Sequence, residues 1–162
     1  MIIETERLIL RKWTQDDAES LFIYAKNPNV GPIAGWPPHK DIESSKYVID
    51  NVFTGAECYA ICEKENNVAI GAVELKLNGH TDMTDRDDEC ELGYWLGEPF
   101  WGRGYMPEAA YALMKRGFET LEILQYGVAI MTEIKSPKEY RRNLDLFIII
   151  LAMRFQYHCL MR

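Results

Sequence analysis

Hydrophobic residues recur along this chain with two different periods, and the periods predict a series of strands and helices. Strict alternation over 4–12 predicts a first strand in which Leu8 and Leu10 share one face. Helical spacing follows over 14–27 and over 41–53. Alternation returns over 57–63, 68–77 and 91–96, and a last helical pattern covers 105–120. The predicted order is therefore one strand, two helices, three strands and a helix.

The helical segments carry local signals for where they begin and which face they bury. Thr14, with Asp17 three residues later, is a variant of the capping box that begins many helices. The candidate buried positions of 41–53 are Ile42, Tyr47, Ile49 and Val52, and those of 105–120 are Ala109, Ala110, Leu113, Met114, Gly117 and Phe118. Each set predicts one face that packs on the rest of the domain.

Two long loops are candidates for binding a substrate. The segment 29–40 holds two glycines, three prolines and Trp36. An exposed Trp in a proline-fixed loop often lines a binding cleft, but Trp36 could equally plug the edge of the core. The segment 78–89 is strongly acidic. It is interpreted first as a solvated loop, and an amine-attracting rim is the alternative.

Gly102 and Gly104 bracket Arg103 between the strand that ends near Leu96 and the helix that begins at Tyr105. Glycines at this place allow backbone N–H groups to point into a common space, and a helix N-terminus adds partial positive charge there. The combination suits a phosphate or pyrophosphate. A tight turn with glycine for geometry alone is the plainer explanation, and the residues by themselves favour it.

Two glutamates lie inside the hydrophobic pattern of the predicted strands. Glu91 begins the strand 91–96, and Glu74 interrupts the apolar residues of 68–77. A carboxylate on a central strand can act as a general base or align a water for an attacking amine. A hydrogen-bonded structural role remains open for both.

Composition narrows the classes of protein. The chain has 162 residues, of which 48% are hydrophobic, and a net charge of −7 with a pI of about 5.0. This length suits one domain with a substantial core. The acidity argues against nucleic-acid binding, which needs a basic surface, and is explained best by solubility.

The four cysteines and the apolar runs predict a cytoplasmic protein. No two cysteines form C-x-x-C, so we expect buried thiols in a reducing compartment and no metal site. Met1 is followed by Ile2, Ile3 and Glu4 without a signal-peptide pattern. The apolar run 144–153 is too short to span a bilayer, so no membrane association is expected.

Three features together resemble the GNAT N-acetyltransferases, in the RimJ/RimL-like branch of ribosomal-protein N-terminal acetyltransferases. They are the start T-E-R-L-I-L-R with Asp17-Ala18, the central G-Y-W-L-G-E-P-F-W-G-R-G-Y-M-P-E-A, and the order of elements. The resemblance covers 1–124. It implies an α/β (α+β) fold, with a single domain built on a mixed, mostly antiparallel sheet flanked by helices.

The resemblance also implies acetyl-CoA as the donor and a primary amine as the acceptor, which attacks directly in a ternary complex. The pyrophosphate would be held by Trp101, Gly102, Arg103, Gly104, Tyr105 and Met106. The pantetheine arm would pair with the backbone of Tyr94, Trp95 and Leu96. Glu91 is the first candidate base and Glu74 the second, while Trp36 would cover the acceptor, either a protein N-terminus or a small amine.

From Gln125 the resemblance ends, and 125–162 is an atypical C-terminal segment of the same domain. Reading the third base of each codon with the first two bases of the next allows I-W-C-G-Y-Y-D-G-N-Q-K-S-K-R-V-Q-E-K-L-G-F, which does resemble the family. We therefore hypothesise a frameshifted tail, and a divergent tail is the alternative. The pattern over 126–131 still predicts a strand.

The altered tail has two expected consequences. An uncovered sheet edge or apolar face would favour association between copies of the chain. The chain could also be a catalytically impaired acyl-CoA-binding protein, which is the alternative to an active N-acetyltransferase.

Overall fold

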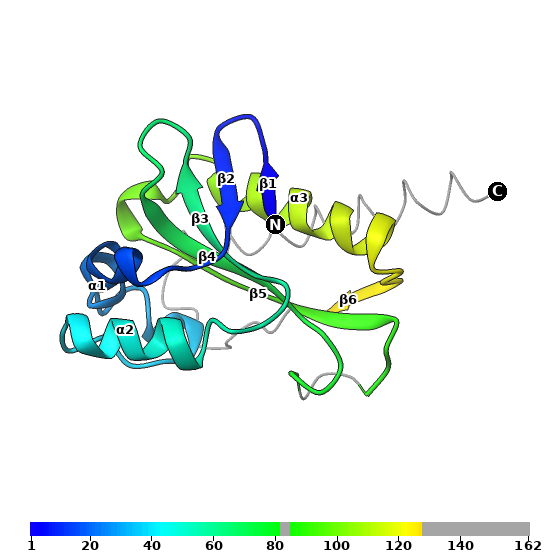
Figure 1. The fold of residues 1–162 in the computed structure, drawn as a ribbon, viewed down its shortest axis with the longest axis horizontal. Helices are drawn as coiled ribbons and strands as arrows, with labels where there is room; N and C mark the ends of the chain where they lie inside the picture. The colour runs from blue at the N-terminus through cyan, green and yellow to red at the C-terminus, as the bar shows by residue number, and fades with distance from the viewer. Residues whose placement is uncertain (82–84, 128–162) are drawn as a thin grey trace. The chain divides into compact units, whose positions relative to one another are not determined.

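The computed structural model describes residues 1–81 and 85–127, all within one unit, Met1–Ala129. These residues form a sheet with strand order β1-β2-β3-β4-β5-β6 (Figure 1). The strands are β1 (Ile2–Glu4), β2 (Leu8–Arg11), β3 (Cys58–Glu63), β4 (Ala69–Lys76), β5 (Glu89–Leu96) and β6 (Gln125–Gly127). Every neighbouring pair is antiparallel except β5 and β6, so the predicted mixed, mostly antiparallel sheet is confirmed.

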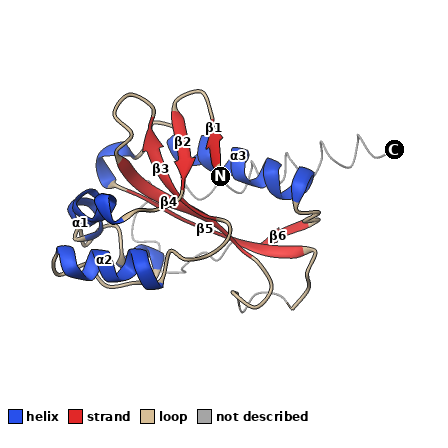
Figure 2. Ribbon diagram, viewed as in Figure 1, coloured by secondary structure: helices blue, strands red, loops and turns tan. Residues whose placement is uncertain are grey.

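Helices cover the sheet on both faces. They are α1 (Ala18–Ala25), α2 (Ile42–Asn51) and α3 (Tyr105–Thr120). α1 packs on α2 and β4 at one face, whereas α3 contacts β2, β4 and β5 from the other (Figure 2). Successive side chains of a strand point to opposite faces of the sheet, so each strand contributes to both layers of packing. In β4, Ala72 packs in the core with the α1 residues, whereas Leu75 lies against Gly117 of α3.

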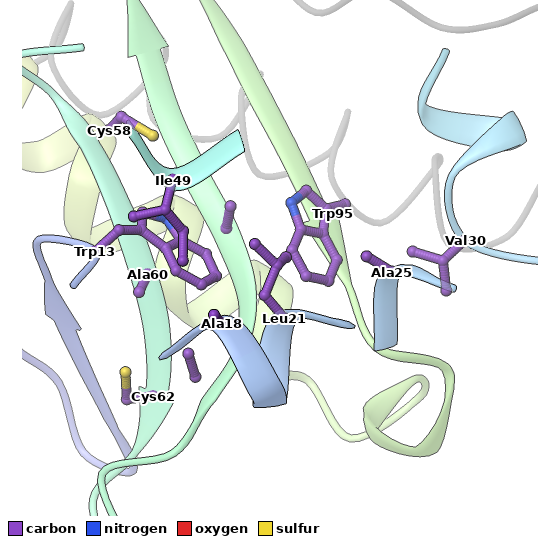
Figure 3. Packing of buried hydrophobic residues seen from close by; sticks show 12 residues of the cluster. Trp13, Ala18, Leu21, Ala25, Val30, Ile49, Cys58, Ala60, Cys62 and Trp95 are labelled. Carbon is purple, nitrogen blue, oxygen red and sulfur yellow. The ribbon is translucent and has the colours of Figure 1, made fainter. Parts of the chain in front are cut away.

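The core on the α1 and α2 face is built from small strand residues and large aromatic rings. Cys58, Ala60 and Cys62 line one face of β3, and the indole rings of Trp13 and Trp95 pack among the helix side chains above them (Figure 3). The two indoles stack with centroids 6.4 Å apart. Small residues on the strands leave room for the tryptophans, which lie between the sheet and the helices.

The predicted buried thiols are confirmed for the three cysteines in the described part of the chain. Cys58, Cys62 and Cys90 are free and buried, and burial raises their pKa values to about 12, 11 and 12. They therefore stay protonated at neutral pH and act as small hydrophobic residues. Cys159 lies outside the described residues.

The prediction of one continuous strand over 4–12 is wrong, because this part of the chain turns and forms a hairpin of β1 and β2. Glu4 pairs with Ile9, and the chain turns between them, where the Thr5 N–H donates to the Leu8 carbonyl at 3.0 Å. The Thr5 side chain also accepts from the Leu8 N–H. A side chain that bonds nearby backbone can close a turn that hydrophobic periodicity does not reveal.

The predicted buried face is confirmed for α3 and only in part for α2. The α3 face is confirmed, with Ala109, Ala110, Leu113, Met114 and Gly117 buried and Phe118 partly buried against Tyr126. In α2, Ile49 is buried, but Tyr47 and Val52 are 65% and 56% exposed, so their predicted burial is wrong. α2 packs mainly on α1 at the outside of the domain, and this narrow contact needs few of its apolar residues.

Two predicted local features are confirmed. The capping box of Thr14 and Asp17 is present and begins a 3₁₀ turn, Gln15–Asp17, that leads into α1. A register shift lies where Gly71 faces Ile61, and Ala69 faces Cys62. The shift is the β-bulge expected at Gly71.

Candidate functional site

The turn from β5 into α3 exposes a row of backbone donors. Gly102 and Gly104 have φ of +76° and +77°, a conformation that costs residues with a Cβ atom about 1–2 kcal/mol. Within the described part of the chain, no acceptor is present for the N–H groups of Gly102, Arg103, Gly104, Tyr105 and Met106. The last two belong to the first turn of α3, whose N-cap Gly104 has no side chain to accept from them.

Aromatic packing holds this turn against the sheet. Phe100 is buried, stacks on Tyr105 with centroids 6.4 Å apart and meets Tyr24 of α1 edge-on. Trp101 donates its indole N–H to the Leu96 carbonyl at 2.7 Å. The glycines stay on the exposed side of the turn, and the large rings fix the other side.

The edge of β5 beyond Glu91 is not paired with β6. Described pairing with β6 spans only Glu89 to Glu91. Gly97 donates to Ile70, and paired positions alternate along an antiparallel ladder, so Trp95 also turns its backbone groups toward β4. By the same alternation, the backbone groups of Tyr94 and Leu96 point away from β4.

Glu91, the first candidate base, is held by two partners. It is 9% exposed, and it accepts from Lys76 Nζ at 2.8 Å and from Thr81 Oγ1 at 2.6 Å. Burial raises the pKa of its carboxyl, but the bonds from Lys76 and Thr81 outweigh burial and leave the pKa below its ordinary value. Such a carboxylate is a stable anion and a weak proton acceptor.

Glu74, the second candidate, is in the opposite state. Its carboxylate accepts no hydrogen bond or ion pair from the residues that the structure describes, and burial raises its pKa. It faces Gly93 across the ladder, where the neighbouring strand contributes no side chain, and its Oε1 lies over Gly55. A half-buried carboxylate without a partner and with a raised pKa is suited to accepting a proton.

Both open alternatives for Trp36 have support in its contacts. Its ring is partly exposed, and it meets Trp95 edge-on with centroids 5.8 Å apart. Trp95 lies on the same face of the sheet as Glu74 and Glu91, since Ala72, Glu74 and Lys76 pair with Trp95, Gly93 and Glu91. The buried Nε1–H of Trp95 has no acceptor among the described residues. Trp36 therefore covers the tryptophan at the side where both carboxylates lie.

Several residues that contact this region were not predicted from the sequence. Lys76 was not singled out, although it determines the state of Glu91. Arg7 and Glu108 were quoted only as parts of motifs, yet they form an ion pair at 2.6 Å beside the glycine turn. Ion pairs between residues about a hundred positions apart leave no local pattern, so only the fold brings them together.

Neither a metal site nor a membrane span is found in 1–81 and 85–127. No group of three or more His, Cys, Asp or Glu residues in this part could hold a metal ion. None of its helices has the length and apolar character needed to cross a bilayer.

Comparison with known proteins identifies related sequences. The family model described as the acetyltransferase (GNAT) domain matches residues 7–136. The N-acetyltransferase p20 of Bacillus licheniformis is 31% identical over 124 residues, which are 74% of this chain and 67% of that protein. The N-acetyltransferase YoaA of Bacillus subtilis (strain 168) is 25% identical over 169 residues, 99% of this chain and 86% of that protein. Both relatives are described as uncharacterized.

Solved structures share the fold. A GNAT-family acetyltransferase from Bacillus anthracis superposes with a TM-score of 0.71 at 22% identity, over 90% of this chain and 82% of that one. A Vibrio cholerae protein with a provisional assignment as a ribosomal-protein-serine acetyltransferase gives 0.68 at 26% identity, over 86% and 79%. An acetyltransferase from Agrobacterium tumefaciens str. C58 gives 0.67 at 26% identity, over 90% and 82%.

Proposed function

Because the chain belongs to the GNAT acetyltransferase family, we propose that it binds acetyl-CoA and transfers the acetyl group to a primary amine. The row of N–H groups from Gly102 to Met106, for which the described residues provide no acceptor, carries this proposal. Backbone donors at a helix N-terminus match the oxygens of a pyrophosphate, and glycines let them approach it closely. Trp101 and Arg103 complete the proposed loop, in which the contacts are mostly from the backbone.

The edge of β5 beyond Glu91, which no described strand pairs, is the proposed partner of the pantetheine arm. Tyr94 and Leu96 turn their backbone groups away from β4, and β6 pairs no further than Glu91. The Leu96 carbonyl is already bonded to the Trp101 indole, so the groups available to the arm are the Leu96 N–H and the N–H and carbonyl of Tyr94. An arm that contains amide groups could pair with this edge and extend the sheet. Trp95, which lies between Tyr94 and Leu96, turns its own backbone groups toward β4. Strand-like pairing would orient the donor relative to Glu74 and Glu91, which project from the Trp95 face.

Acetyl-CoA supplies a thioester, and the reaction forms a C–N bond to the acceptor as the C–S bond breaks. CoA leaves as a thiolate, which takes up one proton to become the free thiol. The amine must lose a proton, and we propose Glu74 as the group that accepts it, directly or through a water. Its unpaired carboxylate and raised pKa support this role. Glu91, which the sequence favoured, would instead keep Lys76 and Thr81 in place.

The acceptor is proposed to enter beside Trp36. This ring and Trp95 form an aromatic wall on the face that carries Glu74. A protein N-terminus and a small amine both fit this description. The likeness to the Vibrio cholerae protein supports placing the chain in the RimJ/RimL-like branch, and the acidic composition agrees with a cytoplasmic enzyme that binds no nucleic acid.

A matched pair of glycine variants tests the proposed acetyl-CoA site. Gly104 and Gly79 both have positive φ, and an added Cβ meets nothing within 4 Å at Gly79 and only Arg7 Nη2 at Gly104. Replacing either glycine by Ala adds a similar backbone strain of about 1–2 kcal/mol. At Gly104, relief of this strain reorients the proposed pyrophosphate loop. Only Gly104→Ala should therefore weaken acetyl-CoA binding, by about tenfold. Calorimetric titration with acetyl-CoA measures this. Equal affinity for both variants would place the ligand elsewhere.

The tail is the remaining part of the proposal. Beyond Gly127 it lies outside the described residues, and the family match ends at 136. We propose that a frameshift produced it and that it promotes association between copies. Sequencing of the coding DNA tests the first point, since an early stop in the shifted frame would contradict it. Sedimentation at high concentration tests the second, and a monomer alone would contradict it.

A further inference from the structure

The hairpin turn between β1 and β2 reaches across the molecule to the first turn of α3. Glu108 of α3 accepts from Thr5 Oγ1 at 2.6 Å, from the Arg7 backbone N–H at 2.8 Å and from Arg7 Nε at 2.7 Å. Arg7 also lies over the Tyr105 ring, 4.7 Å from its centroid. One carboxylate thus gathers donors from a segment about a hundred residues earlier in the chain.

Arg7 makes a further contact with the proposed pyrophosphate loop itself. Its Nη1 donates to the Arg103 carbonyl at 2.9 Å. A trans peptide is planar, with its C=O and N–H pointing in opposite directions. By holding the Arg103 carbonyl, Arg7 therefore aims the Gly104 N–H to the other side, and Gly104 has no side chain that restricts this orientation.

Glu108 raises a question of charge, because it lies in the first helical turn, where an anionic ligand is proposed to bind. A free carboxylate there would compete for the same positive end of the helix. Burial raises the pKa of Glu108, but the bonds from Thr5 and Arg7 outweigh it, so the carboxylate is ionised and paired. The pairing offsets its repulsion of a phosphate while it anchors the helix end to the hairpin.

We propose that Arg7 and Glu108 are positioning residues that hold the loop 102–106 in its binding conformation without touching acetyl-CoA. The proposal rests on the proposed function, because it assigns a role relative to that ligand. Preorganised donors bind more tightly than donors that must first be ordered. Loss of either residue should therefore weaken donor binding and leave the chemical step intact.

A purely electrostatic role of these residues predicts different results. If only net charge mattered, Glu108→Ala would strengthen binding of the anionic donor, and Arg7→Lys would behave like the unaltered protein. The positioning role predicts weaker binding in both, because Ala removes the anchor, and Lys cannot bond Glu108 and the Arg103 carbonyl at once.

The test is calorimetric titration of the full chain with acetyl-CoA, combined with steady-state kinetics. Arg7→Met, Arg7→Lys and Glu108→Ala should each raise the Kd and the donor KM about tenfold, as expected for loss of a charge-assisted hydrogen bond. The kcat at saturating donor and the acceptor KM should stay unchanged. Lys64→Met is the matched control, since Lys64 pairs with Glu4 of the same hairpin and is similarly exposed.

The outcomes separate the two proposals. Tighter binding by Glu108→Ala, unaltered binding by Arg7→Lys, or an equal loss in Lys64→Met would overturn the positioning role while leaving acetyl-CoA binding in place. Failure of the unaltered protein to bind acetyl-CoA would overturn the proposed function itself. Thermal melts of each variant show whether the fold is retained.

Discussion

At the scale of single residues, the clearest distinction is between two glutamates on one face of the sheet. Glu91 is bonded to Lys76 and Thr81, and Glu74 has no partner in the described part of the chain. Their neighbours move the two pKa values in opposite directions. Two carboxylates in such different environments are suited to different tasks, one structural and one chemical.

Glu74→Gln is expected to lower kcat about 10²–10⁴-fold, because the substitution removes the proposed proton acceptor. The Kd for acetyl-CoA should not change. In the unaltered protein, activity should fall as the pH drops through the raised pKa of Glu74, and the variant should lack this acid limb. A pH series of initial rates tests this, and an unchanged acid limb in the variant would assign the proton transfer to another group.

The same raised pKa has a consequence for stability. The folded protein binds this proton more tightly than the unfolded chain, so ionisation of Glu74 lowers stability as the pH rises through the folded pKa. At neutral pH the Gln variant should therefore be at least as stable as the unaltered protein. Urea unfolding measures this, and a marked loss of stability would indicate a structural role for Glu74.

Glu91→Gln should have the opposite effect. Its lowered folded pKa means that the carboxylate stabilises the fold above its ordinary pKa, and that this contribution is lost as the pH falls through the folded value. The variant should lose about 1–2 kcal/mol at neutral pH, discounted for the partly exposed Lys76. Urea unfolding at neutral and acid pH should show the difference shrinking in acid; a difference that is independent of pH would contradict it.

The sequence places both glutamates on strands of one sheet and ranks Glu91 first, but it does not show what surrounds either carboxylate. The state of Glu91 depends on Lys76, which lies opposite it across the β4–β5 ladder, and on Thr81 in the following loop. The strand pattern predicts neither the register nor the loop path. The sequence therefore suggests Glu91 first, whereas the bonds to Glu91 and the raised pKa of Glu74 are the reasons for proposing Glu74 as the base.

At the scale of elements, the candidate site is formed by β4, β5 and the turn that leads from β5 into α3. The helix α3 follows this turn directly. The limits of α3 at Tyr105 and Thr120 were predicted, because the glycines before the helix and its regular apolar face are local signals in the sequence. The hairpin at the start of the chain was missed, since a turn closed by Thr5 and Leu8 leaves the hydrophobic alternation unbroken.

At Gly117, α3 and β6 come into close contact. An added Cβ would clash with the Tyr126 hydroxyl and come within 3.1 Å of Leu75 Cδ1. That hydroxyl donates to the Met114 carbonyl at 2.9 Å, and the Tyr126 ring meets Phe118 edge-on. The close approach of strand and helix thus depends on the missing side chain.

Gly117→Ala should accordingly destabilise the protein by about 1–3 kcal/mol, although Ala is the better helix former by about 1 kcal/mol. The clash outweighs the gain in helix propensity, because Tyr126 must move to admit the methyl group. Tyr111 is exposed, so Tyr111→Ala is a control on the same helix that should change stability little. Thermal unfolding compares the two, and a stabilised Gly117→Ala variant would show that β6 docks without this close contact.

At the scale of the whole molecule, helices cover both faces of one sheet. The turn after β5 and the part of the β5 edge that no described strand pairs, Tyr94 to Leu96, lie at the same end of that strand. The family order of elements made this arrangement predictable, because the strand, glycine turn and helix lie in one continuous stretch. The pairs Arg7–Glu108 and Lys76–Glu91 join separate segments, and only the folded chain shows them.

The central claim is that this chain uses acetyl-CoA to acetylate a primary amine. Its most direct test is mass spectrometry of a panel of small amines and N-terminal peptides after incubation with the purified chain and acetyl-CoA, with free CoA measured in parallel. We expect an N-acetylated product and an equal amount of released CoA, both reduced in Glu74→Gln. No acetylated amine, with CoA released no faster than without protein, would contradict it.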